Sequence, residues 1–396
     1  MKNKPIKFLD LGYQPLANSF IDKKNINKKE KKYRLIVSFN KQNFLVSINN
    51  SFSSKEMFDD KYPYRSSMSK AVSNSFKKLS TSIKKKLKPN KILEIGSNDG
   101  TFLNNFSKKK IIGIEPCKNV EKLTKKKGYT TYPLYWNDKT CKFLKKKHGQ
   151  FDLIFSANTL SHIKNLGDVF KNILNILSDD GTLIIEDPSL LECIRTNTYD
   201  QFYNEHIYVF SSLGLNEVLK KNNLEIYKID QLNIHGGSNR YYIKKIKNKK
   251  KIQNSFFKQI KDEIKFGLKK AKTYHDFSQR VKKSQKSLKK IFTNLKKKNK
   301  KIIGYGATAK STTVLNYCGI TNNEIDYFVD TTPDKQNKLT PGTKIKILKY
   351  TGGINKDVDY VYLGAWNFKE EILKKESKYV QRGGRFIIHV PFPRIL

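Results

Sequence analysis

The sequence predicts an α/β protein whose main part is a doubly wound, mostly parallel sheet. Three observations indicate this fold class. Strand-like and helix-like segments alternate from residue 91 to residue 246, a tight turn at Gly96 follows the first of these strands, and a second α/β block begins near residue 301. Such alternation is typical of parallel sheets that helices cover on both faces.

The central segments are assigned from their hydrophobic period and residue types. Four apolar runs are expected to be parallel strands, three segments to be helical, and two further runs to close the block as a hairpin. The strands are KILEIG (91–96), IIGIEP (111–116), FDLIFSAN (151–158) and GTLIIED (181–187), the helices begin at DGTFLNNF (99–106), DVFKNILNIL (168–177) and LGLNEVLKKN (213–222), and the hairpin is LEIYKIDQL (224–232) with RYYIKKI (240–246).

The flanking segments divide the chain further. Short β-like pieces at 34–38 and 44–48 predict a small α+β domain, Ser66 to Lys84 is expected to be helical, and the lysine-rich stretch 247–301 has the apolar spacing of a helix. The expected units are an N-terminal domain (1–75), a central domain (76–246), a helical connector (247–300) and a C-terminal Rossmann-like α/β domain (301–396).

Composition excludes several classes of protein. The net charge is +44, but the lysines are scattered along the whole chain, so we expect no nucleic-acid partner. None of the four cysteines forms a CxxC pair, which predicts no metal site, reduced thiols and a cytoplasmic protein. No apolar run approaches the ~18 residues of a membrane span, and none is expected.

A nucleoside half-site is predicted in the first βαβ unit. Gly96 and Gly100 let the backbone approach a ligand closely, and Asn98, between them, tolerates positive φ better than most residues. Glu94 precedes the turn and is expected to accept a hydrogen bond from an amino group of the ligand. Glu115 ends the next strand, where a carboxylate can accept the ribose hydroxyls.

The same turn favours S-adenosylmethionine (SAM) over a dinucleotide. GSNDG has no third glycine for close helix packing beside a pyrophosphate. Asn158 ends the following strand, with His162 close behind it, on the methionine side of the expected pocket. We therefore predict a SAM-dependent methyltransferase with a class I central domain, and Asn158 is a further cofactor candidate.

A candidate acid–base cluster follows in YDQFYNEH (199–206). His206 titrates near neutrality, Glu205 is expected to orient it or hold its charge, and Tyr203 can donate to a developing oxyanion. This set suits removal of a proton next to a carbonyl group. The alternative is an ordinary structural histidine in a loop.

Two further polar motifs have alternative interpretations. HGGSNR contains His235, Ser238 and Arg240, which predict either an anion-binding turn or an ordinary Gly-Gly hairpin turn. GYGATAK contains Gly306 and Lys310, whose turn is expected either to hold a diphosphate or to belong to a degenerate nucleotide fold that only packs.

Taken in order, these motifs closely resemble the sugar C-methyltransferase family that acts on nucleotide-linked keto-deoxysugars. The resemblance covers nearly the whole chain. The matching segments are LGYQPLANSF (11–20), YPYRSSMS (62–69), LEIGSNDGTFL (93–103), YDQFYNEH (199–206), HGGSNR (235–240), GYGATAKSTTVLNYCGI (304–320) and PGTKIKI (341–347).

The resemblance implies an enzyme with an N-terminal zinc-binding domain, a central SAM domain and a C-terminal nucleotide fold. The nucleotide sugar would lie between the last two. His206 would remove the proton at C3 of a 4-keto sugar, and Tyr203, Glu205 and Tyr64 would surround the sugar. The resulting enolate would attack the methyl group of SAM.

The chain departs from the family at two places. No cysteine precedes Cys117, so we predict no zinc and a reduced first domain held by packing. Asn204 stands where the family usually has a histidine, which weakens a two-histidine mechanism. Two alternatives remain open: SAM-dependent O- or N-methylation of another metabolite, and an RNA-associated methyltransferase or RNA-binding protein.

Overall fold

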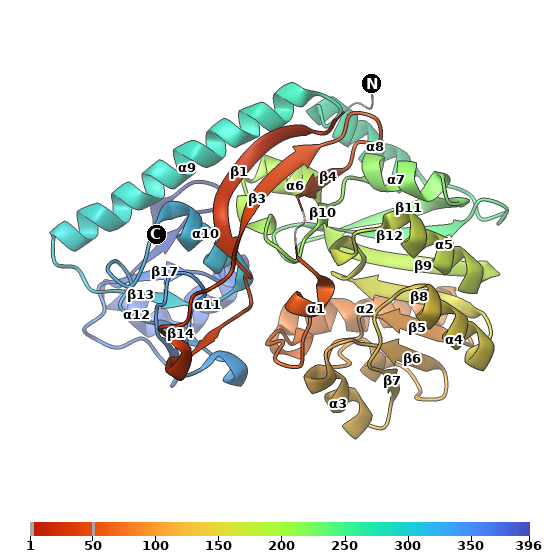
Figure 1. Cartoon of the computed structure of the whole chain (residues 1–396), viewed down its shortest axis with the longest axis horizontal. Coiled ribbons are helices and arrows are strands. Elements are labelled where there is room, and N and C mark those ends of the chain that lie inside the picture. Colours follow the sequence, from red (N-terminus) through yellow and green to blue (C-terminus); the bar gives the residue numbers. More distant parts are fainter. Residues whose placement is uncertain (1–3, 50–51) are drawn as a thin grey trace.

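The computed structural model describes residues 4–49 and 52–396, so residues 1–3 and 50–51 of the expected N-terminal domain lie outside it. Three larger sheets, a separate strand pair and the two long helices α2 and α9 organise the molecule (Figure 1). The helices are α1 (Ser54–Met57), α2 (Lys70–Lys86), α3 (Lys118–Lys126), α4 (Asp138–His148), α5 (Leu166–Ile176), α6 (Leu190–Arg195), α7 (Ser212–Lys220), α8 (Asn254–Phe266), α9 (Ala271–Lys297), α10 (Ala309–Cys318), α11 (Lys369–Lys375) and α12 (Ser377–Gln381).

The central sheet has seven strands in the order β11-β12-β9-β8-β5-β6-β7. The five strands from β9 to β7 are parallel, and β12 is antiparallel to both β9 and β11. This is the predicted doubly wound sheet with its closing hairpin. The strands are β5 (Ile92–Ile95), β6 (Ile111–Ile114), β7 (Thr130–Tyr132), β8 (Phe151–Ala157), β9 (Leu177–Pro188), β11 (Leu224–Leu232) and β12 (Ser238–Lys245).

Helices cover both faces of the central sheet because the apolar side chains of its strands point alternately to each face. Leu93 and Ile154 pack in one core with residues of α4, α5 and α7. Ile92 and Phe155 pack in another with α2. Helix α2 crosses residues 75 and 76, where the sequence analysis divides the first two domains.

The N-terminal sheet has the order β1-β3-β4-β10, and its strands pair antiparallel. Its last strand comes from the middle of the chain. The strands are β1 (Ile6–Pro15), β3 (Lys32–Phe39), β4 (Val46–Ile48) and β10 (Tyr208–Val209). Because β10 directly follows YDQFYNEH, this pairing joins the N-terminal region to the candidate acid–base segment.

The C-terminal sheet has the order β16-β14-β13-β17-β18-β19 and is parallel except for its last strand pair. A separate strand pair, β2 (Ile21–Asp22) with β15 (Lys338–Leu339), attaches the N-terminal region to this domain. The sheet strands are β13 (Ile302–Tyr305), β14 (Phe328–Asp330), β16 (Ile347–Lys349), β17 (Tyr360–Leu363), β18 (Arg385–Ile388) and β19 (Arg394–Ile395).

Helices α8 and α9 are more than a connector. Glu263 of α8 accepts hydrogen bonds from the backbone N–H groups of Ser212 and Leu213, the first residues of α7, at 2.8 and 2.9 Å. Helix α9 runs beside β1 towards the C-terminal domain (Figure 1), and its Tyr274 stacks on Phe39. One hydrophobic core thus joins the N-terminal sheet, α9 and the C-terminal sheet.

Two sequence expectations about local structure need correction. DGTFLNNF is not the start of an α-helix: it forms turns and a short 3-10 helix at Leu103–Asn105. The Asn105 side chain donates to the carbonyls of Thr101 and Phe102, which competes with α-helical hydrogen bonding. The helix expected at Ser66–Lys84 begins at Lys70, where the Ser69 side chain caps it.

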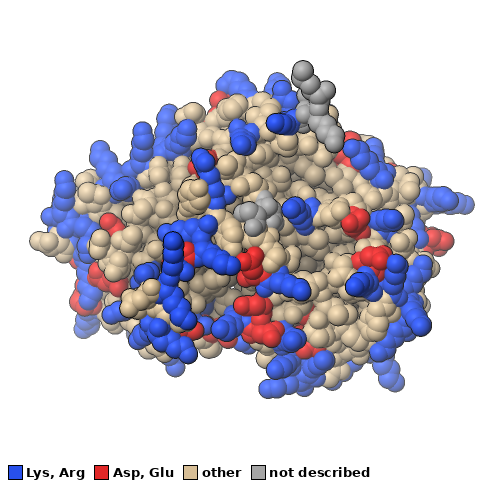
Figure 2. All heavy atoms as spheres, in the orientation of Figure 1, with Lys and Arg blue, Asp and Glu red and all other residues tan. Residues whose placement is uncertain are grey.

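The charges show no concentrated footprint on the face seen in Figure 2. Lysine and arginine side chains cover its rim and are dispersed across it, with acidic side chains between them. A nucleic-acid groove would gather the cations in one continuous stripe. In the part of the chain that the structure describes, no helix is long and apolar enough to cross a membrane.

Candidate active site

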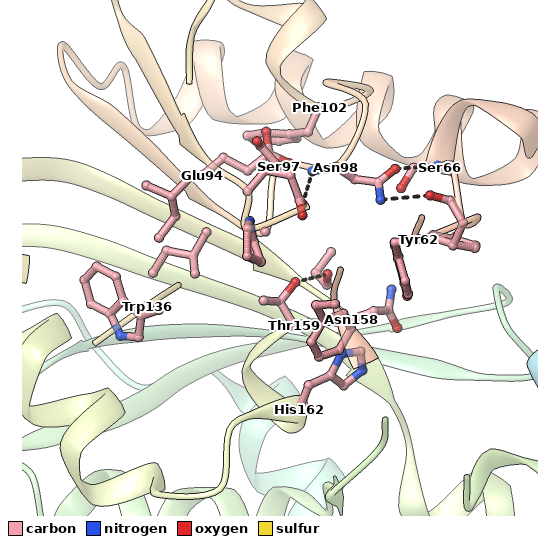
Figure 3. A pocket seen from close by; sticks show the side chains of 18 of the residues that line it. Tyr62, Ser66, Glu94, Ser97, Asn98, Phe102, Trp136, Asn158, Thr159 and His162 are labelled. Atoms are coloured by element: carbon pink, nitrogen blue, oxygen red, sulfur yellow. Dashed lines mark hydrogen bonds between the residues drawn. The ribbon is translucent and has the colours of Figure 1, made fainter. Parts of the chain in front are cut away.

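A cavity lies at the carboxyl ends of β5, β6 and β8, where open α/β sheets bind their ligands. The segment before α2 covers it with Phe58, Tyr62 and Tyr64. In Figure 3, Tyr62 and Asn158 line one end, and Trp136 lies at the other.

The turn after β5 has the conformation that its residue types predict. Gly96 and Asn98 have φ of 75° and 48°, and both line the cavity. A Cβ atom at Gly96 would lie 2.1 Å from Oγ1 of Thr159, so only glycine fits. Gly100, with φ of 81°, does not line the cavity; it faces Thr124 and serves the turn alone.

Glu115 connects this turn to the end of β6. Its Oε2 accepts from the backbone N–H of Asn98 at 2.9 Å, and its Oε1 accepts from that of Cys117 at 3.0 Å. Burial raises the pKa of Glu115, although these two hydrogen bonds oppose the shift. A carboxylate fixed in this way retains lone pairs that can accept ribose hydroxyl groups.

The cavity has an acidic wall in an otherwise very basic protein. Glu94 lines it and is 4% exposed, and its Oε2 has no hydrogen-bond partner among the described residues. Burial raises the pKa of Glu94 well above its usual value, and the nearby carboxylates Asp99 and Glu115 add to the shift. A cationic ligand would relieve this repulsion, and SAM carries both an ammonium and a sulfonium group.

Asn158 lines the cavity as predicted, with φ of 49°, and its backbone N–H donates to the carbonyl of Glu186 at 2.8 Å. His162 lines the same end, and its Nε2 has no partner among the described residues. Burial lowers the pKa of His162 to about 3, so its imidazole is neutral. Sequence reasoning placed His162 near the pocket but gave it no role.

His206 does not line this cavity; the ring of His162, which does, lies against it. Four rings stand in contact: Phe58 is 5.6 Å from His162, His162 is 5.1 Å from His206, and His206 is 4.1 Å from Tyr203, measured between centroids. Burial lowers the pKa of His206 well below its usual value, and His162 and Lys310 add to the shift. The imidazole is therefore neutral, which is the state that a general base requires.

Glu205 does not orient His206, contrary to the sequence-based expectation. Its carboxylate accepts from Asn18 Nδ2 at 2.6 Å and from the Tyr62 hydroxyl at 2.9 Å. Burial raises the pKa of Glu205 to about 7. The loop that carries His206 is thus attached to the LGYQPLANSF and YPYRSSMS motifs, and Tyr62, rather than Tyr64, is the tyrosine bound to Glu205.

Asn204, beside this pair, is 1% exposed, and neither atom of its side-chain amide has a partner among the described residues. Tyr64 lines the cofactor cavity, and its carbonyl accepts from Asn98 Nδ2 at 3.2 Å. Tyr203 has its pKa raised well above the usual value by burial, and next by Glu205. Its phenol therefore remains protonated and can donate.

The HGGSNR motif forms the turn between β11 and β12. His235, Gly236 and Gly237 have positive φ, and a Cβ atom at Gly236 would lie 2.4 Å from the Trp366 ring of the C-terminal domain. Ser238 donates to the carbonyl of Ile234 within the turn. Gly236 is thus required for close contact with the C-terminal domain, whereas Gly237 makes room for Glu192 of α6, where a Cβ atom would lie 2.8 Å away.

Arg240 is not available as an anion receptor. Its Nε and Nη2 both donate to Oε2 of Glu186, at 2.9 and 2.7 Å, and the pair is nearly fully buried. A guanidinium already neutralised by a carboxylate has little attraction left for a phosphate.

The GYGATAK turn also differs from the diphosphate expectation. Gly306 has φ of 80°, and its N–H donates to the carbonyl of Val329. The N–H of Ala307 donates to Asp330, and that of Thr308 to Ser311. Lys310 Nζ donates to the carbonyl of His235 at 3.1 Å. These groups are used within the protein, which favours the degenerate-fold alternative.

A second cavity lies between the HGGS turn and the C-terminal domain. Gly236, Gly237 and Ser238 line one side. Trp366, Phe368 and several charged side chains line the rest; the charged residues are Glu192, Arg195, Lys369, Glu370, Glu371 and Arg394. It therefore combines aromatic surface with three cationic and three acidic side chains.

Within residues 4–49 and 52–396, no cluster of three or more His, Cys, Asp or Glu side chains is arranged to hold a metal ion. All four cysteines are free and buried. Absence of zinc remains a prediction.

Three family models match consecutive parts of the chain. They are described as "Putative zinc binding domain" (residues 2–58), "Methyltransferase domain" (64–229) and "C-methyltransferase C-terminal domain" (233–391). The cavity, its acidic wall and these matches define a SAM-dependent methyltransferase, with S-adenosylmethionine as its cofactor.

More particularly, these matches support the C-methyltransferase family that the motifs resemble. It is 26% identical over 307 residues to C-methyltransferase NovU of Streptomyces niveus, covering 77% of this chain and 73% of that protein.

Two solved structures overlap the chain with low scores. Magnesium protoporphyrin IX methyltransferase (ChlM) of Synechocystis PCC 6803 is 9% identical, covers 44% of this chain and 79% of its own, and has a TM-score of 0.33. A SAM-dependent methyltransferase of Thermotoga maritima is 19% identical, covers 44% and 92%, and also has a TM-score of 0.33.

Proposed function

We propose that this C-methyltransferase methylates the carbon next to the ketone of a nucleotide-linked keto-deoxysugar, with His206 as the general base. The observation that carries the proposal is the neutral imidazole of His206, stacked on His162 at the end of the cofactor cavity. A C–H proton becomes acidic enough to remove only beside an activating group such as a ketone.

The neutral state of His206 suits this role. One nitrogen of a neutral imidazole carries a proton, and the other is an acceptor. It takes the proton from C3, and the electrons of that C–H bond form the enolate. Tyr203, whose phenol stays protonated, is the proposed donor to the enolate oxygen.

SAM supplies the electrophilic methyl group when bound. The C3 carbon would form the new bond to that methyl group, the electrons of the broken S–CH₃ bond would remain on sulfur, and His206 would later release its proton to water. The cofactor's ammonium group is proposed to lie beside Glu94, and its ribose hydroxyls beside Glu115.

The nucleotide is proposed to occupy the second cavity. Trp366 and Phe368 offer aromatic surface for a base, and Arg394 offers positive charge for a diphosphate. Lys369 is paired with Glu370 at 3.0 Å. Ser238 would border this cavity as part of its wall. His235, Arg240, Gly306 and Lys310 hold the surrounding structure together. A cytoplasmic location, where nucleotide sugars are available, fits this substrate.

The test is incubation with SAM and a panel of nucleotide 4-keto sugars, followed by mass spectrometry. We expect one added methyl group that stays on carbon in tandem fragmentation. The matched control is the same nucleotide sugar with a 4-hydroxyl in place of the ketone, which should remain unmodified. Methylation of that control on oxygen would favour the O-methyltransferase alternative.

A further inference from the structure

The loop that carries His206 has little regular structure of its own. Between the 3-10 helix at Tyr199–Gln201 and β10 no helix or strand forms, so side-chain contacts must hold the loop. One attachment is Glu205, bound to Asn18 and Tyr62. The other is Asp200, at the opposite end of the loop.

Asp200 is fully buried and reaches into the C-terminal domain. Its Oδ2 accepts from Nε1 of Trp366 at 2.6 Å and lies 3.3 Å from Nε2 of His389. His389 is also fully buried, and its Nδ1 lies 3.2 Å from the Tyr362 hydroxyl. Three residues of the C-terminal domain thus form a chain of polar contacts that ends on the loop.

The Asp200 carboxylate of this cluster is charged in the protein interior, where an ionised group is costly. Burial opposes ionisation of Asp200, but its hydrogen bond and electrostatic interaction with His389, followed by Lys310 and Trp366, hold its pKa below the usual value. A buried carboxylate is tolerated only with such partners, so displacing the C-terminal domain would leave it uncompensated. The contact is therefore strongly coupled to the domain arrangement.

A neighbouring contact fixes the same arrangement. The carbonyl of His235 accepts from Gln201 Nε2 at 2.7 Å and from Lys310 Nζ at 3.1 Å. The loop, the HGGS turn and the start of α10 thus meet at one carbonyl group.

We infer that the cluster formed by Asp200, His389 and Trp366 is a positioning device, which holds the loop so that His206 meets the substrate only when the C-terminal domain is docked. This inference rests on the proposed role of His206. The cluster residues are positioning residues, because they act through the loop and not on the reacting carbon.

The test uses the full chain and its two tryptophans. In ¹⁵N-labelled protein they give two indole N–H signals, and Trp366→Phe assigns them. The Trp366 indole, 2.6 Å from a carboxylate, should resonate downfield of the Trp136 indole, which donates to the carbonyl of Val169 at 3.4 Å. Asp200→Asn should move the first signal upfield and leave the second in place.

The same variant should lose about 10- to 100-fold in kcat on the nucleotide keto sugar, while its SAM affinity stays within about twofold. If Asp200→Asn folds poorly, Trp366→Phe can be used in its place, because it leaves Asp200 paired with His389. We expect Trp366→Phe to lose less kcat than Asp200→Asn. Asp276→Asn, which breaks an exposed ion pair with Lys272 on α9, is the matched control and should change neither signal nor rate.

Two outcomes would overturn the inference. If the Trp366 signal does not move in Asp200→Asn, the contact does not hold the domain; if it moves and kcat is unchanged, the contact does not position the base. Failure of the proposed function is distinguishable, since His206→Ala would then methylate normally while its Trp366 signal, which does not depend on the base, stays at the wild-type position.

Discussion

The chain contains the same strand–turn–acid arrangement twice, after β5 and after β13. Gly96 and Gly306 both have positive φ, and an acidic residue stands at the end of the neighbouring strand in each case: Glu115 directly follows β6, and Asp330 is the last residue of β14. Each acid accepts two backbone N–H groups, Glu115 from Asn98 and Cys117, and Asp330 from Ala307 and Thr332.

The two turns differ in what faces the acid. Glu115 borders the cofactor cavity. Beside Asp330 lies the buried ammonium of Lys335, 3.7 Å from the carboxylate and donating to the carbonyl of Ala307 at 2.8 Å, with the ring of Phe20 5.4 Å away. The second turn thus contains its own cation, where the first leaves room for a cationic ligand. A glycine turn followed by an acidic residue therefore indicates the fold. Whether the turn binds a ligand depends on whether a side chain already occupies the space beside the carboxylate.

The largest effect on stability is expected from Asp330→Ala. Removing this carboxylate leaves Lys335 buried without its charge partner, which typically costs about 3–5 kcal/mol in the free energy of unfolding. SAM affinity should be unchanged, because the other turn holds the cofactor. Urea denaturation with a parallel SAM titration checks both, and a loss below about 1 kcal/mol would show that the second turn does not depend on its internal ion pair.

Glu115→Ala should do the reverse: it should lower the affinity for SAM and leave the free energy of unfolding largely unchanged. It removes the proposed acceptor of the ribose hydroxyls, at about 1.5–3 kcal/mol per charge-assisted hydrogen bond before water replaces part of the loss. We expect SAM to bind roughly 10- to 100-fold more weakly, equivalent to about 1.4–2.8 kcal/mol, by titration calorimetry. Wild-type affinity in this variant would contradict the assignment of Glu115.

Glu205→Gln should change how stability depends on pH. The pKa of Glu205 is raised from 4.5 to about 7 by burial. Between these values the folded protein keeps a proton that the unfolded chain releases, so this residue lowers stability as pH rises through the window, by at most about 3 kcal/mol.

The glutamine variant lacks this loss and should gain stability relative to the wild type from pH 4.5 to pH 8, as measured by denaturation at each pH. Its loss of activity should be milder than that of His206→Ala, since Asn18 and Tyr62 keep most of their contacts. Parallel stability curves for variant and wild type would contradict the raised pKa.

The smallest expected signal is metal content. The N-terminal sheet packs in one hydrophobic core with α9 and the C-terminal domain, and no cysteine precedes Cys117. We therefore expect protein purified without chelator to contain well under one zinc per chain by atomic spectroscopy. A stoichiometric zinc that resists dialysis would show that the first domain keeps a site without cysteines.

The cofactor half of the site could be predicted from the sequence because its residues are close together in the chain. A glycine turn, Asn98 at positive φ and an acid nineteen residues after Gly96 report local backbone geometry. Strand β1 was not predicted. It contains Gly12, it ends in Pro15, and its pairing with β3 has register shifts, so its sequence lacks a regular alternation of apolar and polar residues.

The substrate half could not be predicted in the same way. The partners of Glu205 are 187 and 143 residues away, and those of Asp200 are 166 and 189 residues away. The sequence motifs indicated that these residues are functionally important, but they did not indicate which residues are in contact in the folded protein. Lys310 and Arg240 were expected to bind anions because a cation in a polar motif does not reveal that a carbonyl or a carboxylate already holds it.

The most direct measurement of the proposed chemistry is proton NMR of the keto sugar in deuterated water, with wild type and His206→Ala side by side. A positioned general base is typically worth ~10²–10⁴-fold in rate, so the variant should bind SAM normally while exchange of the C3 proton and methylation both collapse. Wild-type enzyme should exchange that proton, if its release precedes methyl transfer. Equal exchange in both proteins, or methylation by His206→Ala at near the wild-type rate, would contradict the assignment of His206 as the base.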